Sequence, residues 1–247
     1  MTPPASLSIF GLGPKGLPQL TLEVLEAMKG CDEIHANTQF QESLEEFCRS
    51  LKIPFKPLNW GQQSACPHAA TAPGRPPLDS IAAQLEARLQ EGVCVGLIVD
   101  GHPNLFCFAT ELIEGCRKKG YECRTYAAIS ALDQILVALA PFAGEQFEAG
   151  LTICSVLTPG LEKIRFDGGL GILLYNMGHL LKGAPGKFDE LCARLTAQFG
   201  REHKVFLVEC TPSGDNVRPC ALKDVASELK LIGVNLTLFV PQPARIS

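Results

Sequence analysis

Short apolar runs alternate with longer segments of helical periodicity through the first half of the chain. Residues 7–10 predict a first strand, and the apolar positions within residues 20–29 recur at the spacing of one helix face. The run at 93–99 is apolar without alternation, which is typical of a strand buried on both faces of a parallel sheet. Strands and helices that alternate in this way predict a parallel sheet with helices on its faces.

The same patterns predict the remaining elements. In the first half they indicate further strands at 33–36 and 122–126, and helices at 41–52, 78–90 and 108–119. A helix is expected at 130–140, and beyond it the regular alternation of strand and helix ends. There the patterns indicate strands at 151–156, 171–175, 205–209 and 237–240, and helices at 187–199 and 221–231. We therefore expect two α/β domains, residues 1–127 and 128–247.

Residues 59–77 interrupt this regularity. The segment is built from Pro, Gly, Ala, Ser and Gln without periodicity. So long a stretch without regular structure in a compact domain is usually a functional loop or lid, or else it is disordered.

Composition narrows the class of protein. Of the 247 residues, 46% are hydrophobic and 19% are charged, which is typical of a globular chain. The net charge of −4 gives no electrostatic footprint for a nucleic acid. No apolar run approaches the roughly 18 residues that a membrane span needs, and no signal peptide is visible. We expect a cytoplasmic protein that binds neither nucleic acid nor membranes.

Cysteine and histidine provide no pattern for a metal site. The chain has 11 cysteines, none in a C-x-x-C pair, and its 5 histidines are scattered. In a reducing compartment such cysteines behave as small hydrophobic residues. We expect no bound metal and no disulfide framework.

The turn after the first predicted strand is rich in glycine and has the sequence Gly11-Leu12-Gly13-Pro14-Lys15-Gly16. It resembles the dinucleotide fingerprint, in which glycines bring backbone N–H groups close to a pyrophosphate. However, Pro14 removes one donor, and the third glycine is misplaced for that fingerprint. A ligand-binding turn and an ordinary tight turn both explain the segment.

A second candidate, Asp100-Gly101-His102-Pro103, closes the most apolar predicted strand. Ligands of open α/β sheets bind at such carboxyl ends. Glycine permits close approach of the backbone, and proline makes the exit rigid. His102 is either a ligand contact or a half-buried histidine that is satisfied within the protein.

Small or amide-bearing residues follow two other predicted strands, at Ser130-Ala131 and at Asn176-Met177-Gly178. They are either ligand contacts or, more simply, a helix N-cap at Ser130 and a turn at Gly178. The sequence contains no G-x-S-x-G, P-loop, H-E-x-x-H or kinase motif.

Taken in order, these four segments resemble the tetrapyrrole methylase superfamily of S-adenosylmethionine-dependent methyltransferases. The resemblance spans nearly the whole chain, including the stretch Leu20-Thr21-Leu22 after the first turn. It implies two α/β domains of the tetrapyrrole methylase type, with S-adenosyl-L-methionine in the cleft between them and S-adenosyl-L-homocysteine as product. It also implies a homodimer.

Finer features are similar to one branch, the borosin-type peptide backbone α-N-methyltransferases. That branch has a Gly-His-Pro signature, which matches Gly101-His102-Pro103, and a segment similar to Phe199-Gly200-x-x-His203. The resemblance implies that the following residues line the cofactor pocket: Pro14, Asp100, Gly101, His102, Leu105, Phe106, Ser130, Ala131, Asn176, Met177, Cys210, Leu236 and Thr237.

The chain departs from that branch where catalysis is expected. Borosin-type enzymes have a loop with tyrosines around an arginine that polarises the peptide amide. Here Arg75 is kept, but Asp79 stands where a tyrosine would fall, and Phe55 and Trp60 replace others. A phenyl ring cannot exchange a proton as a phenol does. We therefore expect Arg75 to polarise the carbonyl oxygen and Asp79 to accept the proton.

Three functions remain open at this point. The first is methylation of a precursor peptide, which is expected in trans because the chain ends at Ser247 without a peptide extension. The second is methylation of a tetrapyrrole-like or other small molecule in the same pocket. The third is a catalytically silent protein that binds S-adenosylmethionine and a peptide.

Overall fold

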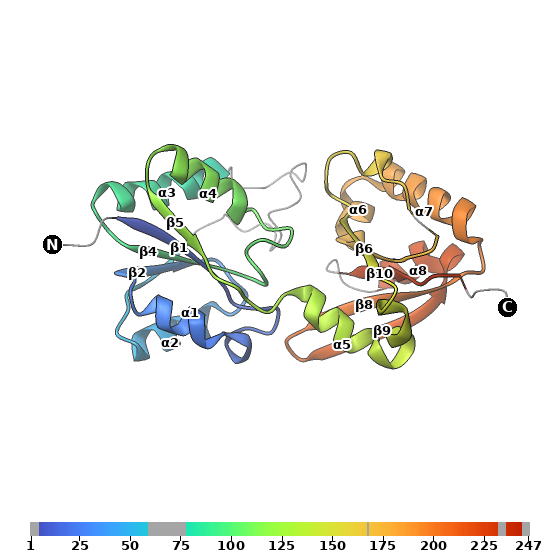
Figure 1. Cartoon of the computed structure of the whole chain (residues 1–247), viewed down its shortest axis with the longest axis horizontal. Coiled ribbons are helices and arrows are strands. Elements are labelled where there is room, and N and C mark those ends of the chain that lie inside the picture. Colours follow the sequence, from blue (N-terminus) through green and yellow to red (C-terminus); the bar gives the residue numbers. More distant parts are fainter. Residues whose placement is uncertain (1–4, 59–77, 167, 232–235, 244–247) are drawn as a thin grey trace. The chain divides into compact units, whose positions relative to one another are not determined.

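The computed structural model describes residues 5–58, 78–166, 168–231 and 236–243. The chain divides into two compact units, an N-terminal unit of Met1–Ala131 and a C-terminal unit of Leu132–Ser247. Each contains one five-stranded sheet with helices packed on it (Figure 1). The predicted α/β fold class is confirmed.

The sheet of the N-terminal unit is parallel throughout. Its strands lie in the order β3-β2-β4-β1-β5, and every neighbouring pair is parallel. The strands are β1 (Ser6–Gly11), β2 (Glu33–Ala36), β3 (Phe55–Pro57), β4 (Val95–Val99) and β5 (Glu122–Thr125). The helices between them are η1 (Leu17–Gln19), α1 (Leu22–Met28), α2 (Gln41–Ser50), α3 (Leu78–Gln90) and α4 (Ala109–Lys118).

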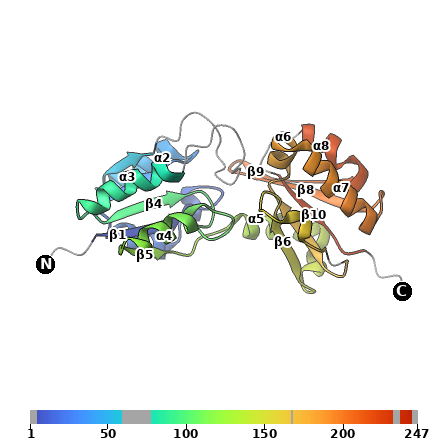
Figure 2. The same cartoon turned by 90° about the horizontal axis from the view of Figure 1, so that it is seen from above.

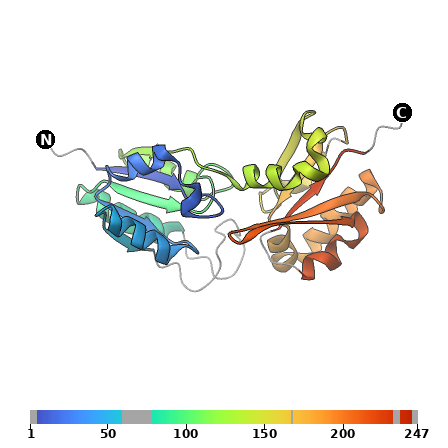
Figure 3. The same cartoon turned by 90° about the horizontal axis from the view of Figure 1, so that it is seen from below.

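The two faces of this sheet are covered by different helices. Phe10 of β1 packs with residues of α1 and α2, whereas the adjacent Ile9 packs with residues of α3 and α4. This follows from the strand geometry, in which successive side chains point to opposite faces. Figures 1 and 2 show α3 and α4 on one face, and Figure 3 shows α1 and α2, in blue, on the other.

The sheet of the C-terminal unit is mixed. Its strands lie in the order β6-β7-β10-β8-β9, of which only the β6–β7 pair is parallel. The strands are β6 (Leu151–Ser155), β7 (Gly171–Tyr175), β8 (Lys204–Thr211), β9 (Gly214–Ala221) and β10 (Thr237–Val240). The helices are α5 (Ala131–Ala143), η2 (Gly144–Phe147), η3 (Leu161–Lys163), α6 (Met177–Gly183), α7 (Pro185–Phe199), η4 (Leu222–Asp224) and α8 (Val225–Leu231).

The core of this unit also has two layers. Residues of α6, α7 and α8 pack on one face of the sheet, with Phe188 and Leu191 fully covered. On the other face Phe142 of α5 lies against Phe206 of β8, with ring centroids 5.7 Å apart.

Helix α6 and strand β9 of the C-terminal unit were not predicted from the sequence. Helix α6 begins directly after Asn176, where only a turn was considered. Strand β9 is rich in exposed polar residues and contains Pro219, yet it pairs with β8 along its whole length. As the outermost strand of the order it can hold a proline, which donates no hydrogen bond.

None of the cysteines among the described residues is in a disulfide, and several are buried. Burial raises the pKa of the Cys31 thiol to about 12 and that of Cys48 to about 11. These thiols therefore stay protonated at neutral pH and pack as small hydrophobic side chains. Among the described residues, no helix is long and apolar enough to cross a membrane, and no cluster of three metal-ligating side chains is found.

Candidate functional site

The carboxyl ends of β1 and β4 form the topological switch point of the N-terminal sheet. These two strands are parallel neighbours, so the turns that follow them lie side by side. The chain leaves β1 toward α1 on one face and leaves β4 toward α4 on the other. Open α/β sheets bind their ligands at such a point.

Two of the predicted motifs are joined here by backbone contacts. The N–H of Leu12 donates to the carbonyl of Val99 at 2.9 Å, and that of Gly13 donates to the carbonyl of Gly101 at 3.3 Å. Gly13 and Gly101 also form an isolated antiparallel bridge. Their φ angles of 75° and 73° are in the left-handed region that favours glycine. Both glycines are therefore required by the backbone conformation of the paired turns.

Space around the paired turns is distributed unevenly. A Cβ at Gly11 would lie 2.3 Å from the carbonyl oxygen of Gly101 and 2.4 Å from the Cβ of Ala128. A Cβ at Gly101 would meet no described atom within 4 Å outside its own neighbours in the chain. The turns are therefore tightly packed on the sheet side and, as far as the described atoms go, open beside Gly101.

Asp100 is held by the turn that follows β2. The hydroxyl of Thr38 donates to Oδ1 of Asp100 at 2.5 Å, and the backbone N–H of Gln39 also bonds to this carboxylate. Burial raises the pKa of Asp100, and the two hydrogen bonds act in the opposite direction. Thr38 was not singled out from the sequence. The only signal was its place just after a predicted strand.

The rest of this loop is ordered by local bonds. Nδ1 of His102 accepts from the N–H of Asn104 at 3.1 Å, so a neutral imidazole carries its proton on Nε2. The N–H of Leu105 donates to the carbonyl of His102, and Phe106 has a φ of 50°. Leu105 and Phe106 are half-buried apolar side chains next to the turn.

The other residues of this unit that were predicted to line the cofactor pocket follow the carboxyl ends of β1 and β5. Pro14 follows Gly13 and is half-buried. Ser130 is buried, and Ala131, which begins α5, is half-buried. Strand β5 is parallel to β1, so residues 126–131 leave the sheet at the same edge as the two turns. The hydroxyl of Thr21, the N-cap of α1, also reaches the carbonyl of Ala127 at 3.5 Å.

In the C-terminal unit the predicted residues gather where β7 ends and β10 begins. Asn176 adopts a left-handed φ of 67°, and its Nδ2 donates to Oγ of the buried Ser155 at 3.0 Å. The N–H of Met177 donates to the carbonyl of Leu236 at 3.1 Å. Thr237, the first residue of β10, is buried. Ser155 was missed in the sequence because a serine that ends a strand has no distinctive pattern.

Cys210 lies on β8 of the same unit, close enough to Tyr175, the last residue of β7, to affect the pKa of its hydroxyl. Burial raises the pKa of Tyr175 well above its usual value, and the nearby Cys210 and Asp133 raise it further. The Tyr175 hydroxyl is therefore neutral at physiological pH.

Of the two predicted catalytic residues, the structure describes Asp79 alone. Arg75 lies outside the described residues. Asp79 is in the first turn of α3, where its side chain is exposed. The pairing of Arg75 with Asp79 stays a prediction.

Comparison with protein families assigns this arrangement to a class. The sequence pattern of the Tetrapyrrole (Corrin/Porphyrin) Methylases matches residues 6–226. The chain belongs to this family and is an S-adenosylmethionine-dependent methyltransferase. Its methyl donor is S-adenosyl-L-methionine and its product is S-adenosyl-L-homocysteine.

Solved structures with the same fold cover nearly the whole chain. Uroporphyrin-III-C-methyltransferase from Thermus thermophilus is 16% identical, with a TM-score of 0.70 over 96% of this chain and 92% of that one. The methyltransferase CobJ is 18% identical, with a TM-score of 0.69 over 98% and 97%. The cobalt precorrin-4 methyltransferase CbiF is 15% identical, with a TM-score of 0.61 over 96% and 94%. No curated protein matches the chain.

The residues at the switch point suit a sulfonium nucleoside. Such a ligand needs close contact with backbone N–H and C=O groups and an apolar surface for its base. The space beside Gly101 permits close contact with the backbone, and the half-buried Leu105 and Phe106 provide an apolar surface for the base.

Proposed function

We propose that this enzyme methylates backbone amide nitrogens of a peptide that is supplied in trans. The observation that carries the proposal is the Gly101-His102-Pro103 turn at the switch point. Its sequence is similar to the signature of borosin-type peptide methyltransferases, and its backbone is tied to the turn after β1.

The reaction needs a nucleophile that the protein holds in position. S-adenosylmethionine supplies an electrophilic methyl group when it is bound. In-line methyl transfer requires that the acceptor nitrogen be held at near-attack distance and that water be excluded. Residues of the paired turns would hold the methyl donor. The half-buried Leu105 and Phe106 would keep water from it.

An amide nitrogen is a poor nucleophile, so its carbonyl must be polarised or its proton removed. We assign Arg75 to the carbonyl oxygen and Asp79 to the N–H proton. The exposure of Asp79 at the first turn of α3 supports this assignment, since its carboxylate is accessible to a substrate from solution.

Replacing Asp79 by asparagine tests the assignment. Loss of a general base costs about 100-fold or more in turnover, so Asp79→Asn should lower kcat by at least that factor while S-adenosylmethionine still binds. Arg75→Ala should behave in the same way. The assay is mass spectrometry of peptide methylation, with Ser80→Ala, an exposed neighbour on α3, as the matched control. Full activity of both variants would exclude this mechanism.

A second candidate is methylation of a small tetrapyrrole. The name of the family and the titles of the similar structures favour it, since those proteins are described as acting on uroporphyrin-III and cobalt precorrin-4. Parallel assays with a reduced porphyrin and with a peptide encoded beside the gene distinguish the two. Binding of S-adenosylmethionine without turnover of either acceptor would favour a silent binding protein.

The homodimer implied by the family resemblance belongs to this proposal as well. Light scattering of the purified protein measures the mass directly. A particle of twice the 26.6 kDa chain mass supports the dimer, and a particle of 26.6 kDa contradicts it.

A further inference from the structure

The hydroxyl of Thr38 connects two loops at the carboxyl edge of the N-terminal sheet. Thr38 follows β2 and is only 8% exposed. Its Oγ1 accepts from the N–H of Phe40 at 3.2 Å and donates to Oδ1 of Asp100 at 2.5 Å. A hydroxyl that both accepts and donates has a fixed orientation. The turn between β2 and α2 is thereby fastened to the end of β4.

From Asp100 the connection continues through the backbone. Asp100 leads directly into Gly101, whose carbonyl accepts from the N–H of Gly13. The side chain of Asp100 is therefore anchored on one side by Thr38 and Gln39, and its main chain enters the paired turns on the other. Hydrogen bonds and the backbone of residues 100–101 therefore link three separate loops.

We propose that Thr38 is a positioning residue for the methyl donor: it holds Asp100 and thereby keeps the Gly101-His102 turn in its binding conformation. The proposal rests on the assignment of that turn to the cofactor. Thr38 itself makes no contact with the donor in this proposal. Its effect comes from preorganisation, because a turn that is already fixed loses less conformational freedom on binding.

Replacing Thr38 by valine removes the hydroxyl and keeps the shape of the side chain. A hydrogen bond to a charged group is strong, so we expect Thr38→Val to raise the Kd for S-adenosylhomocysteine about tenfold. Thr38→Ser restores the hydroxyl and should bind within about twofold of the wild type. Isothermal calorimetry on the full chain measures both. Ser43→Ala is the matched control, because it removes an exposed hydroxyl that donates to the carbonyl of Phe40 in the same segment.

Two further readouts separate positioning from a purely structural role. In turnover assays the KM for S-adenosylmethionine should rise in Thr38→Val with kcat unchanged. A lower melting temperature with an unchanged Kd would overturn the proposal. If Thr38→Val does not fold, Thr38→Ala removes the same hydroxyl from a smaller side chain, and an unchanged Kd in that variant overturns the proposal equally. Failure of the wild type to bind S-adenosylhomocysteine would instead remove the cofactor site itself, and the positioning role with it.

Discussion

Gly11→Ala is expected to lose about 3 kcal/mol or more of unfolding free energy and to reduce methyl transfer about 100-fold. A Cβ at this position would lie 2.3 Å from the carbonyl oxygen of Gly101, 2.4 Å from the Cβ of Ala128 and 2.9 Å from the Cδ of Pro103. None of these atoms is the end of a flexible side chain. The backbone must therefore shift, and the two turns that we assign to the methyl donor move apart.

The control for this variant is Gly115→Ala in α4. A Cβ at Gly115 meets no described atom within 4 Å outside its own helix, and alanine favours a helix interior by about 0.5–1 kcal/mol. This variant should be as stable as the wild type or more so, with full activity. Urea denaturation measures both changes. A Gly11→Ala protein with wild-type stability would show that the close contact at the switch point is not present in solution.

The pattern of apolar residues was sufficient to predict the parallel sheet. The run at 93–99 lacks polar alternation because helices cover both faces of β4, which is the physical cause of the pattern. Strand β9 was not predicted because Asp215, Asn216 and Pro219 have low strand propensity. It is extended because it pairs with the neighbouring β8. Pairing between strands cannot be predicted from the residues of one short segment alone.

In the candidate site, too, local features could be predicted from the sequence and contacts between distant residues could not. Gly13 and Gly101 could be recognised because positive φ angles require glycine, and that requirement is local. The bond between Thr38 and Asp100 could not be recognised, since the residues are 62 positions apart. They meet because β4 inserts beside β2 in the sheet, and hydrophobic periodicity contains no information on strand order. Candidate turns are therefore local features, whereas their contacts depend on topology.

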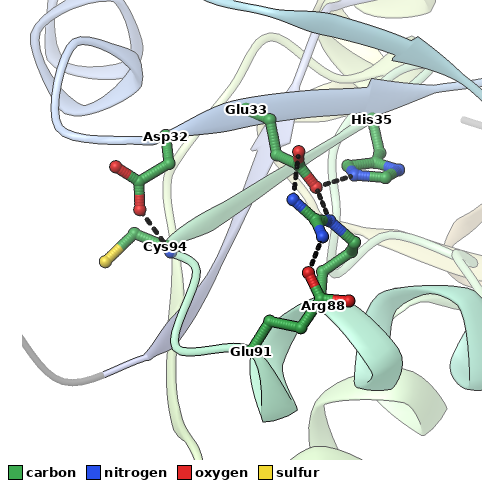
Figure 4. Close-up of polar contacts among 6 residues, drawn as sticks. All are labelled: Asp32, Glu33, His35, Arg88, Glu91 and Cys94. Atoms are coloured by element: carbon green, nitrogen blue, oxygen red, sulfur yellow. Dashed lines mark hydrogen bonds and ion pairs between the residues drawn. The ribbon is translucent and has the colours of Figure 1, made fainter.

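The buried charges of β2 lead to a second large expected effect. Figure 4 shows the Glu33 carboxylate facing the guanidinium of Arg88 on α3, with His35 beside it. Nε and Nη2 of Arg88 donate to the two carboxylate oxygens at 2.7 and 3.0 Å, and Nε2 of His35 donates at 2.7 Å. Glu33 is only 4% exposed, and Arg88 also bonds to Glu91. The carboxylate is therefore buried and bonded on both oxygens.

These bonds hold the pKa of Glu33 at about 2, well below the ordinary 4.5 of a glutamate, chiefly through the Arg88 guanidinium. A carboxyl with a depressed pKa stabilises the fold above its unfolded-state value, and the contribution is lost as the pH falls through the native value. The pair should thus contribute about 3 kcal/mol at neutral pH. That contribution should decline from about pH 4.5 toward pH 2.

Glu33→Gln should therefore be less stable than the wild type by about 3 kcal/mol at pH 7, and the difference should shrink to less than half by about pH 3. Urea unfolding of both proteins at a series of pH values measures it. Glu45→Gln, which removes only the exposed partner of Arg49, should change stability by less than about 0.5 kcal/mol at every pH. A difference between Glu33→Gln and the wild type that stays constant from pH 7 to about pH 3 would mean that ionisation of the Glu33 carboxylate does not stabilise the fold.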